Sequence, residues 1–137
     1  MAGIAGYVVG YYQSARKHPR ESEPLEFREY TLPVSVDDHE PVWSKALADI
    51  IGGEAEYRLP DGSRVDSLDD KFAVEVDWLD KWHQGVGQSL HYSFLSGKDP
   101  VLAIGLKSED YNRDKLKLAK KVANKNGIAV WVIRAEK

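Results

Sequence analysis

The chain of 137 residues has no cysteine, a net charge of only −3 and no long apolar run. Without cysteine it can form no disulfide, no zinc site with thiolate ligands and no cysteine nucleophile. The small net charge means that any binding to nucleic acid must come from a local patch. Glycine-rich phosphate loops and a GxSxG motif are also absent, which leaves no basis for a nucleotide hydrolase or a serine hydrolase. With 42% hydrophobic and 30% charged residues, the chain has the composition of one soluble globular domain.

The N-terminal part is less regular than the rest. Residues 2–12, "AGIAGYVVGYY", are apolar but fewer than the ~20 residues of a membrane helix, so we interpret them as a packed strand, a short helix or a dimer contact. The basic stretch 14–20 leaves the stub of a membrane anchor as an alternative. The polar residues 13–26, which include two prolines, indicate a linker or arm. We therefore expect an apolar segment and arm over residues 1–38 and a single domain over residues 39–137.

Periodicity and turn signals predict the remaining elements. Pro41 is suited to the first turn of a helix that Gly52 and Gly53 end, and Pro60-Asp61-Gly62 is suited to a hairpin turn. The expected elements are an edge strand within 28–36, which Pro33 keeps at the edge, a helix 41–51, a hairpin 54–68, a strand 71–78, a helix 79–96, a strand 100–106, a helix 108–127 and a strand 128–134. Strands separated by helices are normally connected by parallel crossovers, whereas hairpin strands are antiparallel. The fold class is therefore α/β, with a mixed sheet.

The helix 79–96 has a row of large apolar side chains. They recur at spacings of three and four residues, which predicts one buried stripe. The residues of this stripe are Leu79, Trp82, Val86, Leu90 and Phe94.

Three acidic residues occur towards the ends of the second and third strands of this region. Asp66 ends the second hairpin strand, and Glu75 and Asp77 share one face of the strand that follows. Pairing of these two strands would bring the three carboxylates together, and such a cluster raises the pKa of at least one member unless a cation neutralises it. Carboxylate oxygens suit Mg²⁺ or Mn²⁺, which retain water that can attack a phosphodiester.

The succession "IIGG", "GSRVD", "VEVD" and "GQSLHY" resembles the PD-(D/E)XK nuclease superfamily. It is most similar to the branch with a QxxxY motif, which includes the RecB-type and lambda-type exonucleases. The resemblance extends over residues 40–134. It implies a restriction-endonuclease-like core in the order helix, three strands, helix, strand, with a mixed central sheet flanked by helices. The motifs are short, and their order and spacing together carry the resemblance.

The resemblance also implies roles for individual residues. Asp66 takes the place of the metal-binding aspartate, Glu75 that of the acid in the (D/E)XK element, and Gln88 and Tyr92 form the QxxxY pair. Glu40, directly before Pro41, stands in for the glutamate of the first helix. The implied cofactor is Mg²⁺ or Mn²⁺. Its expected ligands are Asp66, Glu75, Asp77 and Glu40.

The chain departs from the family at one position. Two residues after the acid, where the family has lysine, this chain has Asp77. Lys81 is the candidate replacement, because Lys81, Gln88 and Tyr92 fall on one helical face. Lys71, at the start of the strand, is a second candidate. The expected catalytic residues are therefore Asp66, Glu75, Lys81, Gln88 and Tyr92.

Structural explanations remain open for the same residues. Asp77 could cap the following helix, and Asp66 could be a turn residue. Glu75 could face solvent, and Gln88 with Tyr92 could be a surface pair, or Tyr92 part of the core. His39, His83 and His91 lack the spacing of a zinc site. The lysines between residues 115 and 125 could follow a nucleic-acid backbone, but a solvated helix face accounts for them as well.

Two functions remain open. The first is a Mg²⁺- or Mn²⁺-dependent nuclease that hydrolyses phosphodiester bonds, with nucleic acid as its partner and DNA preferred to RNA. The second is a nucleic-acid-binding or assembly protein on the same fold, which has lost catalysis with the strand lysine. We also expect a homodimer as one possible role of residues 2–12, no membrane association, and a cytoplasmic location.

Overall fold

A computed structural model describes residues 7–12 and 25–136 of the chain. The elements are β1 (Tyr7–Tyr12), β2 (Leu25–Leu32), α1 (Glu40–Ile51), β3 (Glu54–Arg58), β4 (Arg64–Leu68), β5 (Phe72–Trp78), the 3₁₀ turn η2 (Leu79–Lys81), α2 (Trp82–Ser96), β6 (Asp99–Leu106), α3 (Arg113–Lys125) and β7 (Ala129–Ala135). The helices and strands expected from residue 41 onwards are confirmed, with boundaries that shift by a few residues.

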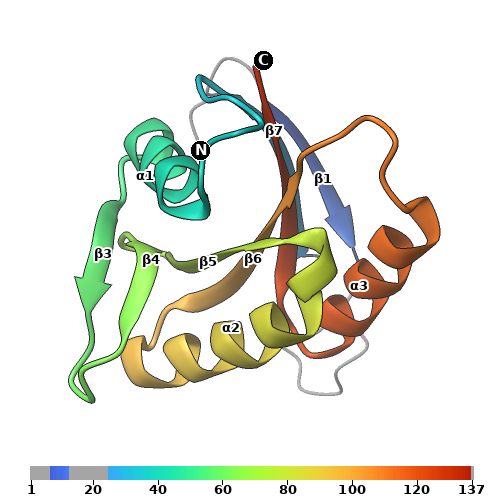
Figure 1. Cartoon of the computed structure of the whole chain (residues 1–137). Coiled ribbons are helices and arrows are strands. Elements are labelled where there is room, and N and C mark those ends of the chain that lie inside the picture. Colours follow the sequence, from blue (N-terminus) through green and yellow to red (C-terminus); the bar gives the residue numbers. More distant parts are fainter. Residues whose placement is uncertain (1–6, 13–24, 137) are drawn as a thin grey trace.

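All the described strands belong to one mixed sheet in the order β1-β2-β7-β6-β5-β4-β3. β2, β7, β6 and β5 run parallel, whereas β1, β4 and β3 join antiparallel at the two sides. Helix α1 covers one face, and α2 and α3 cover the other (Figure 1). The expected α/β class with a mixed, helix-flanked sheet is confirmed; the restriction-endonuclease-like core stays a prediction.

The strand predicted at the sheet edge lies inside the sheet. β2 ends at Leu32, before Pro33, and pairs with β7 on one side and with β1 on the other. The expectation of an edge strand was wrong because Pro33 follows the ladder and so removes no hydrogen bond from it. Of the expected arm, residues 13–24 lie outside the described residues. The boundary at residue 38 stays a prediction, although β1 and β2 share the sheet with the later strands.

The strand alternative for the N-terminal segment is confirmed for residues 7–12, while residues 1–6 lie outside the described part. The homodimer stays a prediction. None of the described helices is long and apolar enough to cross a membrane.

The sheet has an apolar core on each face. On the α1 side, Trp43 and Leu47 of the helix belong to one buried cluster with Trp131 and Ile133 of β7. On the other side, Leu116 of α3 packs in a cluster with strand residues of β6 and β7. The central parallel strands are therefore buried on both faces, as their uninterrupted apolar sequences predict.

Helix α2 buries a different stripe from the one predicted. Leu79 and Trp82 are buried as expected, but Leu90 is 40% exposed and Phe94 86% exposed. The buried positions of α2 are Trp82, Gly85, Ser89 and Tyr92. A spacing of four residues advances by about 40° around a helix at each step, so the predicted stripe has turned roughly 120° away from Trp82 when it reaches Phe94. The middle of the helix therefore faces the sheet with the small residues Gly85 and Ser89.

Candidate metal centre

Strands β4 and β5 separate at Asp66. Their ladder contains the pairs Leu68↔Ala73 and Ser67↔Val74, and at the next step the Val76 amide donates a hydrogen bond of 2.7 Å to Asp66 Oδ2. A side chain thus takes the place of a ladder carbonyl and holds the Asp66 carboxylate against β5. We call this place the β4–β5 fork.

Four acidic side chains meet at the fork. Glu75 lies between Asp66 and Asp77, in hydrogen-bond contact with both, and Glu40, the first residue of α1, is hydrogen-bonded to Asp77. Glu75 and Asp77 are only 6% and 4% exposed. The structure therefore brings together all four residues that the sequence proposed as metal ligands.

Burial controls the protonation of this acid cluster, defined as Glu40, Asp66, Glu75 and Asp77. Burial, then the charges of Asp66 and Asp77, raises the pKa of Glu75 to about 11. Burial also raises the pKa of Asp66 to about 6, against the opposing effect of the Val76 hydrogen bond. The pKa of Glu40 is raised to about 7, first by burial and then by the charge of Asp77. At neutral pH, Glu75 therefore keeps its proton and shares it with its neighbours.

One carboxylate oxygen of the cluster has no partner. Asp77 Oδ2 is buried and accepts no hydrogen bond, and it lies against α2 at Gly85, where an added Cβ would be 2.9 Å away. A buried acceptor without a donor is costly, and more so when it belongs to an ionisable group whose pKa burial has raised. A cation at this oxygen would relieve that cost.

The three candidate residues outside the acid cluster lie on its α2 side. The charge of Lys81 lowers the pKa of both Asp77 and Glu40, so its ammonium group is within electrostatic reach of the acids. Tyr92 is buried, and burial followed by the charge of Glu75 raises its pKa to about 12. Gln88 is exposed, on the same flank of the helix as Lys81 and Tyr92 at about 100° per residue.

The structural alternatives for Asp77, Asp66 and Glu75 do not apply, whereas the surface position proposed for Gln88 stays open. Asp77 caps no helix, since the N-cap residues of η2 and α2 are Trp78 and Lys81. Asp66 belongs to β4, and Glu75 is buried. Tyr92 does pack in an apolar cluster with Val65, so a core role coexists with its position beside the acids.

The remaining candidate groups interact elsewhere. His83 stacks on Trp82 with ring centroids 3.7 Å apart, and His91 Nε2 is 2.9 Å from Asp61 Oδ2. Lys71 lies over the ring of Phe72. On α3, Lys115 pairs with Asp80 at 2.9 Å. The lysines of α3 as a nucleic-acid contact stay a prediction.

Sequence reasoning missed Glu56 and Gly85. Glu56 on β3 has a left-handed backbone (φ 54°), and the hairpin register that pairs Ala55 with Ser67 and Tyr57 with Val65 sets it opposite Asp66. Its charge raises the pKa of Asp66. The Pro60-Asp61-Gly62 turn could have revealed this pairing, because a turn sets the register of its hairpin. Gly85 had no comparable signal.

The donor set suits Mg²⁺ or Mn²⁺, because it consists of hard carboxylate oxygens and includes an unpartnered one. In the described part of the chain, no three or more His, Cys, Asp or Glu side chains are arranged as ligands of one metal ion. The acids instead hydrogen-bond to one another, Glu75 to Asp66 and Asp77 and Glu40 to Asp77, which requires protons on some of them. An ion of this kind would replace those protons.

No protein-family model, curated protein or solved structure matches this chain. The resemblance to the PD-(D/E)XK nucleases therefore depends on the sequence motifs and stays a prediction. The function has to be argued from the side chains at the fork.

Proposed function

We propose that the chain is a metal-dependent nuclease that hydrolyses phosphodiester bonds of DNA or RNA at the β4–β5 fork. One observation carries the proposal: the unpartnered Asp77 Oδ2 is buried among further acids on β4, β5 and α1. Four carboxyl groups so close together are unfavourable when ionised, and a divalent cation is the partner that reverses this cost.

Asp66, Glu75, Asp77 and Glu40 would hold the ion. A bound Mg²⁺ or Mn²⁺ supplies Lewis acidity and lowers the pKa of water enough for attack on phosphorus. The Val76 amide holds Asp66 in place, and Glu75 would give up its proton to act as a ligand. The hydrogen bond to Asp66 and the loss of the proton from Glu75 would both favour fully ionised ligands at neutral pH.

The residues on the α2 side would act on the substrate. Lys81 is exposed and near Asp77, so it can stabilise the charge that develops on the phosphoryl group. Tyr92 remains protonated at neutral pH because its pKa is about 12, and its hydroxyl can donate a hydrogen bond. Gln88, on the same flank, offers an amide for orienting the scissile phosphate.

The second candidate is a nucleic-acid-binding or assembly protein on the same scaffold. The observation that favours it is Asp77, which stands where the related nucleases have lysine and lies against Gly85. In that case the acid cluster would be a remnant that still takes up a cation but does not activate water.

Melting curves and cleavage assays distinguish the two candidates. Mn²⁺ should stabilise the wild-type protein at neutral pH by roughly 2.7 kcal/mol at a hundredfold excess over the dissociation constant. The same ion should support cleavage of single- or double-stranded DNA or RNA. Glu75→Gln should remove both effects, because the amide keeps the shape but loses the charge.

Lys81→Met should keep the stabilisation by Mn²⁺ and abolish cleavage, because its role is charge stabilisation and not ion capture. Lys45→Met, at an exposed position of α1, is the matched control and should change neither. Stabilisation without cleavage of any substrate would favour the binding protein. No response of the wild type to Mn²⁺ in either assay would rule out the metal centre.

A further inference from the structure

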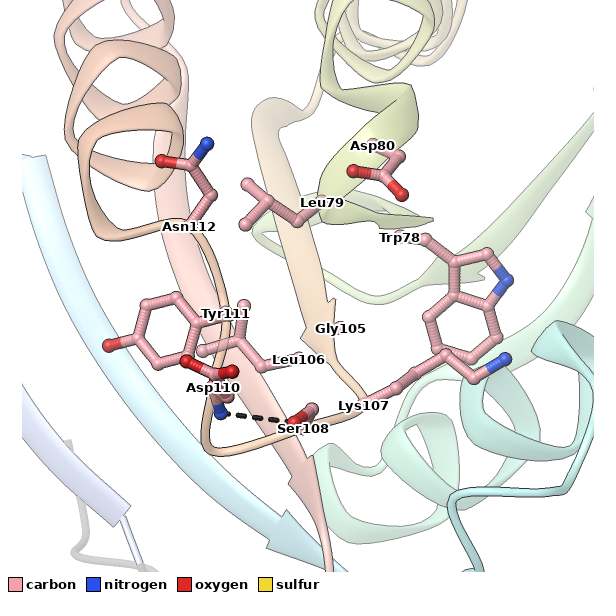
Figure 2. A pocket seen from close by; sticks show the side chains of 10 residues that line it. All are labelled: Trp78, Leu79, Asp80, Gly105, Leu106, Lys107, Ser108, Asp110, Tyr111 and Asn112. Atoms are coloured by element: carbon pink, nitrogen blue, oxygen red, sulfur yellow. Dashed lines mark hydrogen bonds between the residues drawn. The ribbon is translucent and has the colours of Figure 1, made fainter.

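A pocket of about 250 Å³ lies at the carboxyl ends of β5 and β6, beside the β4–β5 fork. Leu79, Gly105 and Leu106 provide its apolar lining, and the rings of Trp78 and Tyr111 stand on opposite sides of it (Figure 2). The polar residues around it are Asp80, Lys107, Ser108, Asp110 and Asn112. An apolar interior between two aromatic rings suits a flat ligand.

The Trp78 ring is fixed by its neighbours, whereas the Lys107 side chain above the ring can move. The indole lies against the Gly105 backbone, where an added Cβ would be only 2.7 Å from the ring, and meets Trp43 edge-on at 4.9 Å between centroids. Lys107 Nζ lies 4.7 Å from the centroid of the Trp78 ring, and its side chain is exposed. The lysine can therefore swing aside and leave a fixed aromatic surface for stacking.

The charges around the pocket are uneven. Asp80 is ion-paired with Lys115 at 2.9 Å. Lys107 has no carboxylate partner among the described residues, while Asp110 stands near Tyr111 on the other side (Figure 2). Beside Tyr111, the Arg113 guanidinium lies 4.5 Å from the ring centroid and donates a hydrogen bond to the Tyr111 hydroxyl. Lys107 is therefore the cation of the pocket lining that is open to an anionic group, beside Trp78. The matching ligand is flat and apolar, with one negative group at one end.

We propose that this pocket binds one unpaired base of a nucleic-acid strand, stacked on Trp78, with the adjoining phosphate on Lys107. The inference rests on the proposed function, and it names single-stranded nucleic acid as the substrate class. A base inside a duplex is already stacked and paired, so it would have to leave the duplex to stack on Trp78. Asp77 and Trp78 are consecutive in β5 and point to opposite faces of the sheet, Asp77 towards Gly85 of α2 and Trp78 towards Trp43 of α1. A strand anchored at the pocket would therefore reach the acid cluster around the carboxyl end of β5.

The tryptophans provide a direct signal. Trp43, Trp82 and Trp131 are buried, whereas Trp78 is partly exposed. Titration of the wild-type protein with short oligothymidylate in EDTA, where no cleavage takes place, should quench the tryptophan fluorescence. Trp78→Phe should remove the quenching and retain most of the binding, because phenylalanine keeps an aromatic ring against Gly105.

Two further variants test the two ends of the ligand by fluorescence anisotropy of the labelled oligonucleotide. Tyr111→Leu, which keeps apolar contact without the ring, should weaken binding about five- to a hundredfold. Lys107→Gln should weaken binding and reduce the slope of log K against log salt by about 0.7, the value for one phosphate of a single strand. The matched controls are Phe94→Leu and Lys45→Gln, an exposed aromatic residue and an exposed lysine outside the pocket and outside α3, which should bind as the wild type does.

Equal quenching by duplex DNA, or Tyr111→Leu and Lys107→Gln variants that are correctly folded and bind like the controls, would overturn the pocket assignment. An absence of oligothymidylate binding in EDTA together with Mn²⁺-dependent cleavage would overturn the pocket and leave the nuclease standing. Binding and quenching without cleavage in Mn²⁺ would support the pocket and reject the nuclease in favour of the binding protein.

Discussion

The parallel centre of the sheet and the β4–β5 fork use burial in opposite ways. β6 pairs continuously with β7 from Val101↔Ala129 to Leu106↔Arg134, and both faces of these strands are covered by apolar side chains. At the fork the antiparallel ladder stops after Ser67↔Val74, and the next side chains are buried acids. The parallel centre of the sheet stabilises the fold. The β4–β5 fork instead brings together acidic side chains whose charge the fold does not neutralise by itself.

The difference has a physical reason. In a complete ladder each backbone N–H and C=O group is satisfied by its neighbour, so the side chains only have to pack. Where the ladder ends, a carboxylate can take over a backbone partner, as Asp66 does at the Val76 amide. Irregular backbone at Glu56, with φ 54°, accompanies this exchange. Such departures from regular structure cluster at functional sites.

The largest effect is expected in the parallel centre of the sheet. Ile133→Ala removes a fully buried side chain from β7 and should lower the free energy of unfolding by about 2 to 5 kcal/mol, since it leaves a cavity in a close-packed core. Urea denaturation measures the loss. The stabilisation by Mn²⁺ should be unchanged, and a loss of that response in a folded Ile133→Ala protein would contradict the separation of the two regions.

A smaller loss is expected where α2 meets the fork. Gly85→Ala adds a Cβ 2.5 Å from Leu102 Cδ1 and 2.9 Å from Asp77 Oδ2, and it should cost about 1 to 3 kcal/mol in thermal or urea unfolding. Gly87→Ala on the same helix meets nothing within 4 Å, so it should gain about 0.5 to 1 kcal/mol from helix propensity. Equal effects of the two substitutions would show that Gly85 makes no close contact.

The free energy of unfolding of the metal-free protein should depend on pH through the acids of the β4–β5 fork and not through the apolar centre of the sheet. The folded pKa of Glu75, about 11, exceeds the ordinary glutamate value, so above the ordinary value the folded state holds a proton that the unfolded state has released. The free energy of unfolding should therefore fall as pH rises from 5 to 8, by about 1.4 kcal/mol per pH unit for one proton.

Urea denaturation in EDTA at several pH values tests this expectation. Glu75→Gln should reduce the slope, most clearly above pH 7, because its amide does not titrate and the pKa values of Asp66 and Glu40 are only about 6 and about 7. A wild-type protein that gains stability between pH 5 and 8 in EDTA would contradict the protonated state of the acid cluster.

The smallest effect concerns the irregular backbone of β3. Glu56→Gly should raise the free energy of unfolding by about 0.5 to 1 kcal/mol, because a left-handed conformation costs about 1 to 2 kcal/mol for a residue with a Cβ. Glu54→Gly, at an exposed position of the same strand without positive φ, should lower it by a similar amount. Thermal melts of both variants provide the comparison, and a destabilised Glu56→Gly protein would mean that its side chain is needed at the fork.

Local patterns in the sequence were sufficient for much of the fold. Pro41 and the two glycines after Ile51 bound α1, and the alternation and turn residues of 54–78 predicted the three strands that carry the acids. The proximity of Asp66 and Glu75 followed from the expected pairing of their strands. These elements depend on residues that are close in sequence, so the spacing of apolar residues and the turn residues predict them directly.

Contacts between distant parts of the chain decided the rest. The position of β2 inside the sheet depends on β1 and β7, and the buried face of α2 depends on how closely Gly85 approaches Leu102 and Asp77. The raised pKa of Glu75, the unpartnered oxygen of Asp77 and the pocket beside Trp78 also come from packing. Local sequence specifies which residues carry charge and which elements hold them. How deeply the charge is buried depends on the packing of the folded chain, because every surrounding element contributes to burial.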